Sequence, residues 1–152
     1  MAKFGVTMQR TASASLSVGS LTAAASSMRR AKIYDLMFGS EATPADNAFL
    51  WQVQACTTAG TAGTNPTPKA LDAADSLAST IVVGQAHSVD PTLTANALPL
   101  SIGLNQRATF RWVAAPGGEI VIPATASNGF AIRTPTAGGL VAVSCTAMYD
   151  EQ

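Results

Sequence analysis

One histidine and two cysteines are the residues of this chain that could most readily do chemistry near neutral pH. His87 is the only histidine, so a histidine-dependent general base or a hydrolytic triad would have to be built around it. Ser88 and Asp90 lie close by in the sequence, but triad members are brought together by the fold and not by adjacency. Because His87 begins a polar loop over 87–94, we expect it to be exposed. A small hydrolase would instead require His87 to be buried beside a carboxylate.

The two cysteines limit metal and redox chemistry. Cys56 and Cys145 lie far apart and outside any CxxC pair, so the chain lacks the ligands for a zinc site unless subunits share one. A disulfide between them would require adjacent strands, and we expect two buried free thiols, as in a chain made in a reducing cytosol. The chain has no GxGxxG, GxxxxGK[ST], HExxH or calcium-loop motif. We therefore predict no catalytic residue, no metal, no cofactor and no enzymatic activity.

Apolar residues on alternate positions dominate the elements that would position these groups. Leu98, Leu100, Ile102 and Leu104 share one parity, which is the period of a half-buried strand. Alternation and turn signals together predict strands at residues 3–10, 30–38, 48–56, 80–83, 98–104, 109–113, 119–122, 130–132 and 140–149. In the strand 48–56 we expect Trp51, Val53 and Ala55 to face inward, and Gln52 and Gln54 outward.

Turn signals divide these strands. Hairpins are predicted at 114–118, which contains Pro-Gly-Gly, and at Asn128-Gly129, a favoured type I′ pair, with one more reversal at 137–139. The final strand has apolar residues on both parities, so we expect burial on both faces, within a sandwich or against another subunit. The segment 57–68 is a predicted long loop.

One short helix is predicted over 72–79, with Asp72 as its N-cap and Leu71 and Leu77 as apolar anchors. With eight or nine strands and at most this helix, the chain is predicted to be all-β, a two-sheet antiparallel β-sandwich of jelly-roll-like form with an extended N-terminal segment. A length of 152 residues suits one such core.

Charge is distributed unevenly although the net charge is zero. Five basic residues and no acidic one precede Asp35, whereas the remainder carries four basic and nine acidic residues. We therefore divide the chain into residues 1–28, a basic Ser/Ala-rich arm or set of edge strands, and a sandwich domain over 29–152. The first segment either reaches onto a neighbouring subunit or acidic surface, or simply keeps a mobile end soluble. Nucleic-acid binding is not expected, since no recognition motif accompanies the modest charge.

Composition favours association with other chains. Hydrophobic residues make up 47% of the sequence and charged residues only 12%, about half the usual charged fraction. Much of the surface must therefore be small, neutral or covered, which indicates an oligomer. No stretch has the 18 apolar residues of a membrane span, and the first residues lack the apolar core of a secretory signal.

Four strand residues have two open interpretations each. Trp51 and Trp112 lie in alternating strands, where core packing is favoured over sugar stacking or a partner contact. Arg111 and Arg133 lie among small or apolar neighbours, so they form salt bridges between subunits or occupy outward-facing positions.

Two long segments resemble small structural proteins encoded among the virion genes of tailed bacteriophages. They are residues 30–54, beginning RAKIYDLMFGSEATPADN and including LWQVQ, and residues 105–119, NQRATFRWVAAPGGE. The resemblance implies a capsid cement or decoration protein: a β-sandwich, often a homotrimer, made in the host cytoplasm and bound to the outside of the major capsid shell. It brings no catalytic residues.

The basic residues are the candidates for contact with the capsid or with a sister subunit. They are Lys3, Arg10, Arg29, Arg30, Lys32, Arg111 and Arg133. The expected partners are the major capsid protein and further copies of the chain, without a membrane. The alternative function is a phage attachment or carbohydrate-binding module, in which loops such as 57–68 and an exposed Trp51 or Trp112 would recognise a host surface.

Overall fold

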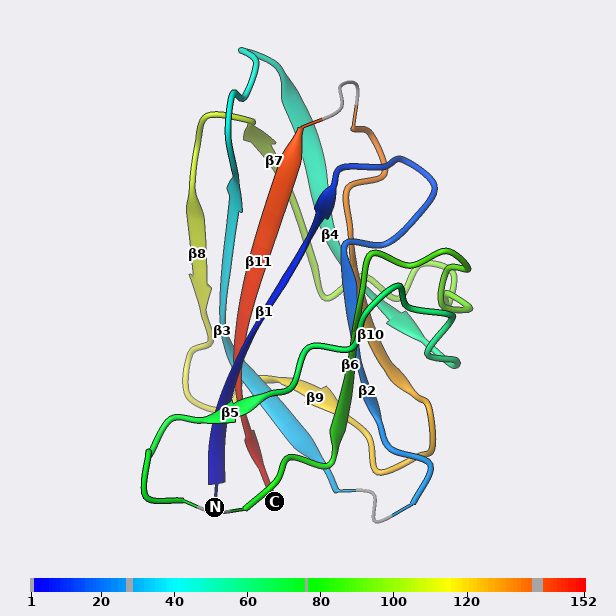
Figure 1. Ribbon diagram of the computed structural model, residues 1–152, viewed down its shortest axis with the longest axis vertical. Coiled ribbons are helices and arrows are strands. Elements are labelled where there is room, and N and C mark those ends of the chain that lie inside the picture. Colours follow the sequence, from blue (N-terminus) through cyan, green and yellow to red (C-terminus); the bar gives the residue numbers. More distant parts are fainter. Residues whose placement is uncertain (1, 27–28, 76, 138–140) are drawn as a thin grey trace.

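The computed structural model describes residues 2–26, 29–75, 77–137 and 141–152, and these form two antiparallel β-sheets packed face to face (Figure 1). The strands are β1 (Ala2–Thr11), β2 (Gly19–Ala23), β3 (Ala31–Ser40), β4 (Ala48–Cys56), β5 (Lys69–Ala70), β6 (Ile81–Gln85), β7 (Leu100–Asn105), β8 (Phe110–Val113), β9 (Ile120–Ile122), β10 (Gly129–Arg133) and β11 (Ala142–Glu151). The predicted sandwich is confirmed, with eleven strands in the described residues where eight or nine were expected.

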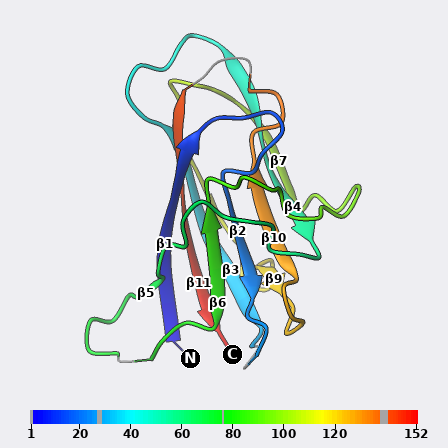
Figure 2. The ribbon, with the colours of Figure 1, turned by 45° about the vertical axis from the view of Figure 1, so that its right-hand side comes forward.

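The strand order assigns each element to a layer. The six-stranded sheet runs β5-β1-β11-β3-β8, with β9 also pairing with β3, and the five-stranded sheet runs β6-β2-β10-β4-β7. Figure 2, turned by 45°, sets β1 and β11 of the first layer beside β2, β10 and β4 of the second. Ala2 pairs with Glu151, so the start of β1 and the end of β11 lie at the same end of the molecule.

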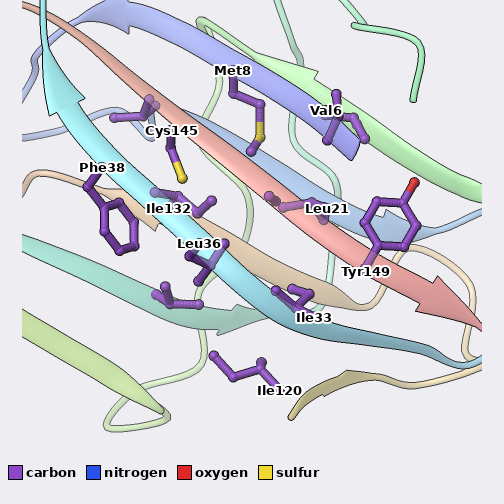
Figure 3. Close-up of a cluster of buried hydrophobic side chains, with 14 of the residues drawn as sticks. Val6, Met8, Leu21, Ile33, Leu36, Phe38, Ile120, Ile132, Cys145 and Tyr149 are labelled. Carbon is purple, nitrogen blue, oxygen red and sulfur yellow. The ribbon is translucent and has the colours of Figure 1, made fainter. Parts of the chain in front are cut away.

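The core fills the space between the sheets with side chains from alternate positions (Figure 3). From β1, Phe4, Val6 and Met8 point inward and are at most 6% exposed, while their odd-numbered neighbours face outward. Phe4 stacks on Tyr149 of β11 with ring centroids 5.7 Å apart. Alternation in the sequence therefore corresponds directly to the buried face of the six-stranded sheet.

The predicted N-terminal arm is wrong for most of its length. β1 pairs with β11 over ten residues, and β2 lies between β6 and β10 in the middle of the five-stranded sheet. All five residues of β2 are buried. Since these strands carry part of the core, a boundary at residue 28 does not separate an arm from the sandwich. Only β1 retains edge character, because its outer side pairs with the two-residue β5 alone.

The two predicted hairpins are also absent from these residues. Gly117 has a φ of 83° and Gly118 N donates to Ala115 O at 2.8 Å, yet β8 and β9 on either side both pair antiparallel with β3. The turn thus connects two strands that do not pair with each other: β8 pairs with residues 35–38 of β3 and β9 with residues 31–33, along the same edge of β3. At the second site β9 belongs to one sheet and β10 to the other. That segment crosses between layers, and Ser127, not Asn128, has positive φ.

Two aspartates form turns where the helix was predicted. The carboxylate of Asp72 accepts a hydrogen bond from Ala74 N, and that of Asp75 accepts one from Leu77 N, each at 2.9 Å. Such local bonds compete with helical ones, and the exposed Leu71 and Leu77 provide no apolar face to dock. The described residues contain no helix, and hence none long and apolar enough to cross a membrane.

The final strand is buried on one face only. In β11 the odd-numbered residues from Val143 to Glu151 are buried and the even-numbered ones are half-buried. The sandwich of a single chain therefore does not bury both faces of β11, and burial of the second face against another subunit stays a prediction. The outer face of the six-stranded sheet stays open, and the predicted reversal at 137–139 lies partly outside the described residues.

Candidate functional site

The two sheets differ in what lies on their outer faces. Over the five-stranded sheet lie the loops 57–68 and 86–97, seen beside β2, β6 and β10 in Figure 1. Thr61 and Val89 form a bridge between these loops, and Leu93 bridges to Cys56 at the end of β4. Gln54 Nε2 donates to Thr94 O at 3.0 Å, so Gln54 is buried beneath a loop although it points outward as predicted.

His87 lies beneath this cover, contrary to the expected exposure. Its side chain is 1% exposed, and His87 Nε2 shares a hydrogen bond of 3.0 Å with Ser20 Oγ of β2. Gly84 of β6 makes room for the ring, since a Cβ there would lie 2.9 Å from His87 Nε2. Burial lowers the pKa of His87, which Asp90 counteracts and Arg10 reinforces. The imidazole is thus held neutral in a polar layer.

A serine bonded to a histidine has the composition of a nucleophile and its base, but this pair is closed to substrate. Ser20 is 1% exposed, and His87 Nδ1 has no hydrogen-bond partner among the described residues. Asp90, the neighbouring acid, accepts a hydrogen bond from Ser17 N at 2.6 Å instead. Triad chemistry needs an oriented base and an accessible hydroxyl, and this pair provides neither. It links the loop 86–97 to β2, and we call it the Ser20–His87 joint. No local signal in the sequence indicated Ser20.

Arg10 and Arg133, two of the predicted contact residues, converge on this joint. Arg10 Nη1 donates to the carbonyl oxygens of Ser17 and His87, at 2.8 and 3.2 Å. Arg133 Nη1 donates to Gln54 Oε1 at 3.1 Å, and its Nε lies 3.7 Å from the Asp90 carboxylate. Both side chains therefore bond to groups of their own chain, and a salt bridge between subunits is not needed to explain Arg133.

Arg111 forms an ion pair on the other sheet. Its guanidinium contacts the carboxylate of Asp35 through Nε, at 3.0 Å, and through Nη2. Asp35 is 3% exposed, so Arg111 neutralises a buried carboxylate on the neighbouring strand. Asp35 raises the pKa of Arg111 in return. Arg111, too, has a partner within its own chain.

The four remaining predicted residues gather at one end of the sandwich. Lys3 and Lys32 both pair in register with Asp150 of β11, and Arg30 O accepts a hydrogen bond from Gln152 N. Arg29 adjoins Arg30, and both are exposed. We call Lys3, Arg29, Arg30 and Lys32, with Lys69 of β5, the basic end. None of these five takes part in an ion pair with another described residue.

The tryptophans belong to the core. Trp51 is 2% exposed and packs against Phe38 and Phe49, with ring centroids 5.0 and 5.8 Å away. Trp112 is half-buried at the edge of the same core. The core-packing prediction is therefore confirmed for Trp51 and holds in part for Trp112.

Two open hollows lie on the exposed face of the six-stranded sheet. One, of about 290 Å³, is lined by residues of β3, β8 and β11, among them Met37, Phe110 and Thr146. The other, of about 410 Å³, lies between β1 and the segment 66–71 and shares Thr146. The linings are small or apolar side chains with one cation each, Arg111 or Lys69, so they present no set of groups for a defined reaction.

The cysteines are buried and free, as predicted. Burial raises the pKa of Cys56 to about 12 and raises that of Cys145 as well, which makes both poor nucleophiles. Within the ranges that the structure covers, no three His, Cys, Asp or Glu side chains come together as a metal site.

These features define the class of protein as an all-β sandwich with one loop-covered sheet face, one open sheet face and a basic end. No protein-family model, curated protein or solved structure was found to match the chain.

Proposed function

We propose that the chain is a virion structural protein, a capsid cement or decoration protein that binds the outside of an assembled major capsid shell and stabilises it. The sequence resemblance of residues 30–54 and 105–119 motivates this proposal. The observation that carries it furthest is the basic end, where five cations that form no ion pair with another described residue collect at one extremity, while Arg10, Arg111 and Arg133 bond to groups of their own chain.

Charge at the basic end favours an acidic partner surface. Arg29 and Arg30 are exposed just before β3, while the nearby carboxylate of Glu151 is buried and accepts hydrogen bonds from Ser79 and Thr80. Asp150 and Glu119, together with Asp72 and Asp75 of the segment that follows β5, lie at the same end as the five cations, so the exposed Arg29 and Arg30 are the charges that we expect a partner surface to meet. Complementary charge guides encounter and fixes orientation more than it adds affinity.

Stabilisation would follow from mass action. A protein that binds the assembled shell and not the separated capsid subunits lowers the free energy of the assembled state. When many copies bind one shell, their individual modest contributions to its stability add up. Copies that are linked to one another also increase the effective concentration of each remaining contact. No catalytic residue is required, and the protein would reach the shell from the host cytoplasm.

Co-sedimentation with shells tests this function. The probe is a shell assembled from the major capsid protein of the genome that encodes the chain. We expect the protein to pellet with shells and not with unassembled capsid subunits. Arg29→Glu with Arg30→Glu should weaken binding at least tenfold, and Arg107→Glu, a charge reversal in the exposed turn after β7, should leave it unchanged. Failure of the unaltered protein to pellet would reject the proposal.

A deletion of residues 2–28 is not a usable test of an arm. It would remove β1 and β2, including the buried Phe4, Met8 and Leu21, and with them part of the core. Charge reversal at exposed positions leaves these strands intact.

The attachment or carbohydrate-binding alternative gains no specific support. It needed a tryptophan displayed over a shallow groove, whereas Trp51 lies within the core and Trp112 packs at its edge. The two hollows of the open sheet face contain neither tryptophan.

A further inference from the structure

β7 ends the five-stranded sheet with an unprotected edge. Its only strand partner is β4, and Gln106 N, just beyond β7, donates to Asn47 O at 2.8 Å. Main-chain groups alternate in direction along an antiparallel strand, so those of Ile102 and Leu104 point to β4. The N–H and C=O groups of Ser101 and Gly103 consequently point away from the sheet.

The other sheet edges are covered or charged, apart from β9, which is uncharged but only three residues long. Gln9 N on β1 donates to Gln85 Oε1 at 3.0 Å, and β5 covers another part of that strand. On β6, Gln85 exchanges main-chain bonds with Thr64. β8 is only four residues long and carries the charged Arg111. β7, with the sequence LSIGLN, has six residues, no charge and no proline, and thus none of the usual protections against strand pairing.

The core is also incompletely covered on this side. Five large inward-facing side chains are only half-buried there: Leu100, Ile102, Leu104, Phe110 and Trp112. The first three come from β7 and the other two from β8. Phe130 of β10 is the one other large apolar side chain of the described core that is partly buried. Two independent features, free main-chain groups and uncovered apolar side chains, therefore coincide on the same margin.

We propose that β7 pairs antiparallel with β7 of a second copy of this chain, to make a continuous ten-stranded sheet. Placing the two-fold axis at Ile102 sets Ser101 opposite Gly103 of the other copy. Each such pair exchanges two main-chain hydrogen bonds, and Ile102 meets its equivalent in the closely spaced pair between them. Leu100, Ile102 and Leu104 of the two copies then lie side by side on the same face of the continuous sheet.

A second copy suits this edge better than a charged partner strand. An uncharged strand meets its own copy without like-charge repulsion. In an antiparallel pair of β7 strands, the outward N–H and C=O groups of one copy lie opposite the C=O and N–H groups of the other. Gly103 also leaves space, since a Cβ there would have no atom within 4 Å. Such an interface uses the same patch on both copies and closes as a dimer. The geometry thus points to two-fold symmetry, where the sequence resemblance suggested a trimer.

Replacement of a residue at the edge tests the pairing. Gly103→Pro removes the outward N–H, and proline is tolerated on an edge strand when its nitrogen faces away from the sheet. By sedimentation equilibrium over a concentration series, we expect the unaltered chain to reach twice 15.5 kDa and Gly103→Pro to remain at 15.5 kDa. Gly103→Ala keeps the N–H and should behave like the unaltered chain.

A second variant guards against misfolding. Ser101→Lys adds a charge at an exposed position of the same strand and should likewise give a monomer, with an unchanged circular dichroism spectrum. A monomeric unaltered chain throughout the series, or an oligomer whose mass neither variant lowers, would overturn the proposal. Neither outcome bears on whether the protein pellets with shells, so the two proposals can fail separately.

Discussion

The two margins of the sandwich end its core in different ways. At the margin of β1 and β6, Val6, Met8 and Val83 are at most 6% exposed, and the Gln9–Gln85 bond links the two layers. At the margin of β7 and β8 the equivalent inward side chains are half-buried and the outer main-chain groups are unpaired. At the first margin a single chain buries its apolar side chains, whereas at the second it leaves apolar side chains partly exposed and main-chain groups unpaired. The proposed pairing through the second margin would therefore leave the core of each chain undisturbed.

The largest effect is expected at the closed margin. Met8 is fully buried and packs so tightly on β2 that a Cβ at Gly19 would lie 2.4 Å from its sulfur. Met8→Ala should lower the free energy of unfolding by about 2 to 5 kcal/mol, because a cavity forms between two fixed sheets. Urea denaturation monitored by tryptophan fluorescence measures it. A loss below about 1 kcal/mol would show that this margin is looser than described.

A smaller effect is expected from the matching truncation at the open margin. Ile102→Ala should cost about 1 kcal/mol in dilute monomer, since its side chain already contacts water. At concentrations that favour the dimer the cost should increase, because Ile102 also meets its equivalent across the axis. Equal costs at both concentrations would count against the paired margin.

The effect of His87 is small near neutral pH and depends on pH. Because its pKa is lowered in the folded protein, the unfolded chain binds a proton that the folded chain does not as pH falls below about 6.5. The contribution of neutral His87 to the free energy of unfolding is therefore fully present above that pH. Below it, the free energy of unfolding decreases by at most about 1.4 kcal/mol per pH unit. His87→Gln, which can still bond Ser20, should flatten the profile between pH 6.5 and 5.5. An unchanged slope would assign the dependence to other groups.

Long alternating segments predicted most of the fold. β1 and β11 each have ten residues in which the apolar parity is the buried one, so local pattern and tertiary burial agree. Apolar parity likewise placed Trp51 in the core. In β3 the buried parity changes between Ile33 and Leu36, where the register with β11 shifts, and the pattern did not predict that change. A short strand such as β5, with two residues, has no pattern to detect and depends on its partner β1.

Pairing between distant segments explains the errors. The Pro116-Gly117 turn forms as its residues require, but the strands beside it pair with β3, which lies more than 70 residues earlier. His87 is buried because two loops fold over β2, and nothing in its own segment indicates that cover. Similarly, β1 became part of the core because β11 pairs with it from the far end of the chain. Turn chemistry is local, whereas sheet membership is not.

Amide hydrogen exchange at Ser101 and Gly103 tests the open margin most directly. In the monomer both N–H groups face solvent and should exchange quickly, while that of Ile102, bonded to β4, exchanges slowly. We expect the exchange of Ser101 and Gly103 to slow progressively as protein concentration is raised, with that of Ile102 little changed. Rapid exchange at both positions at every concentration would contradict the account.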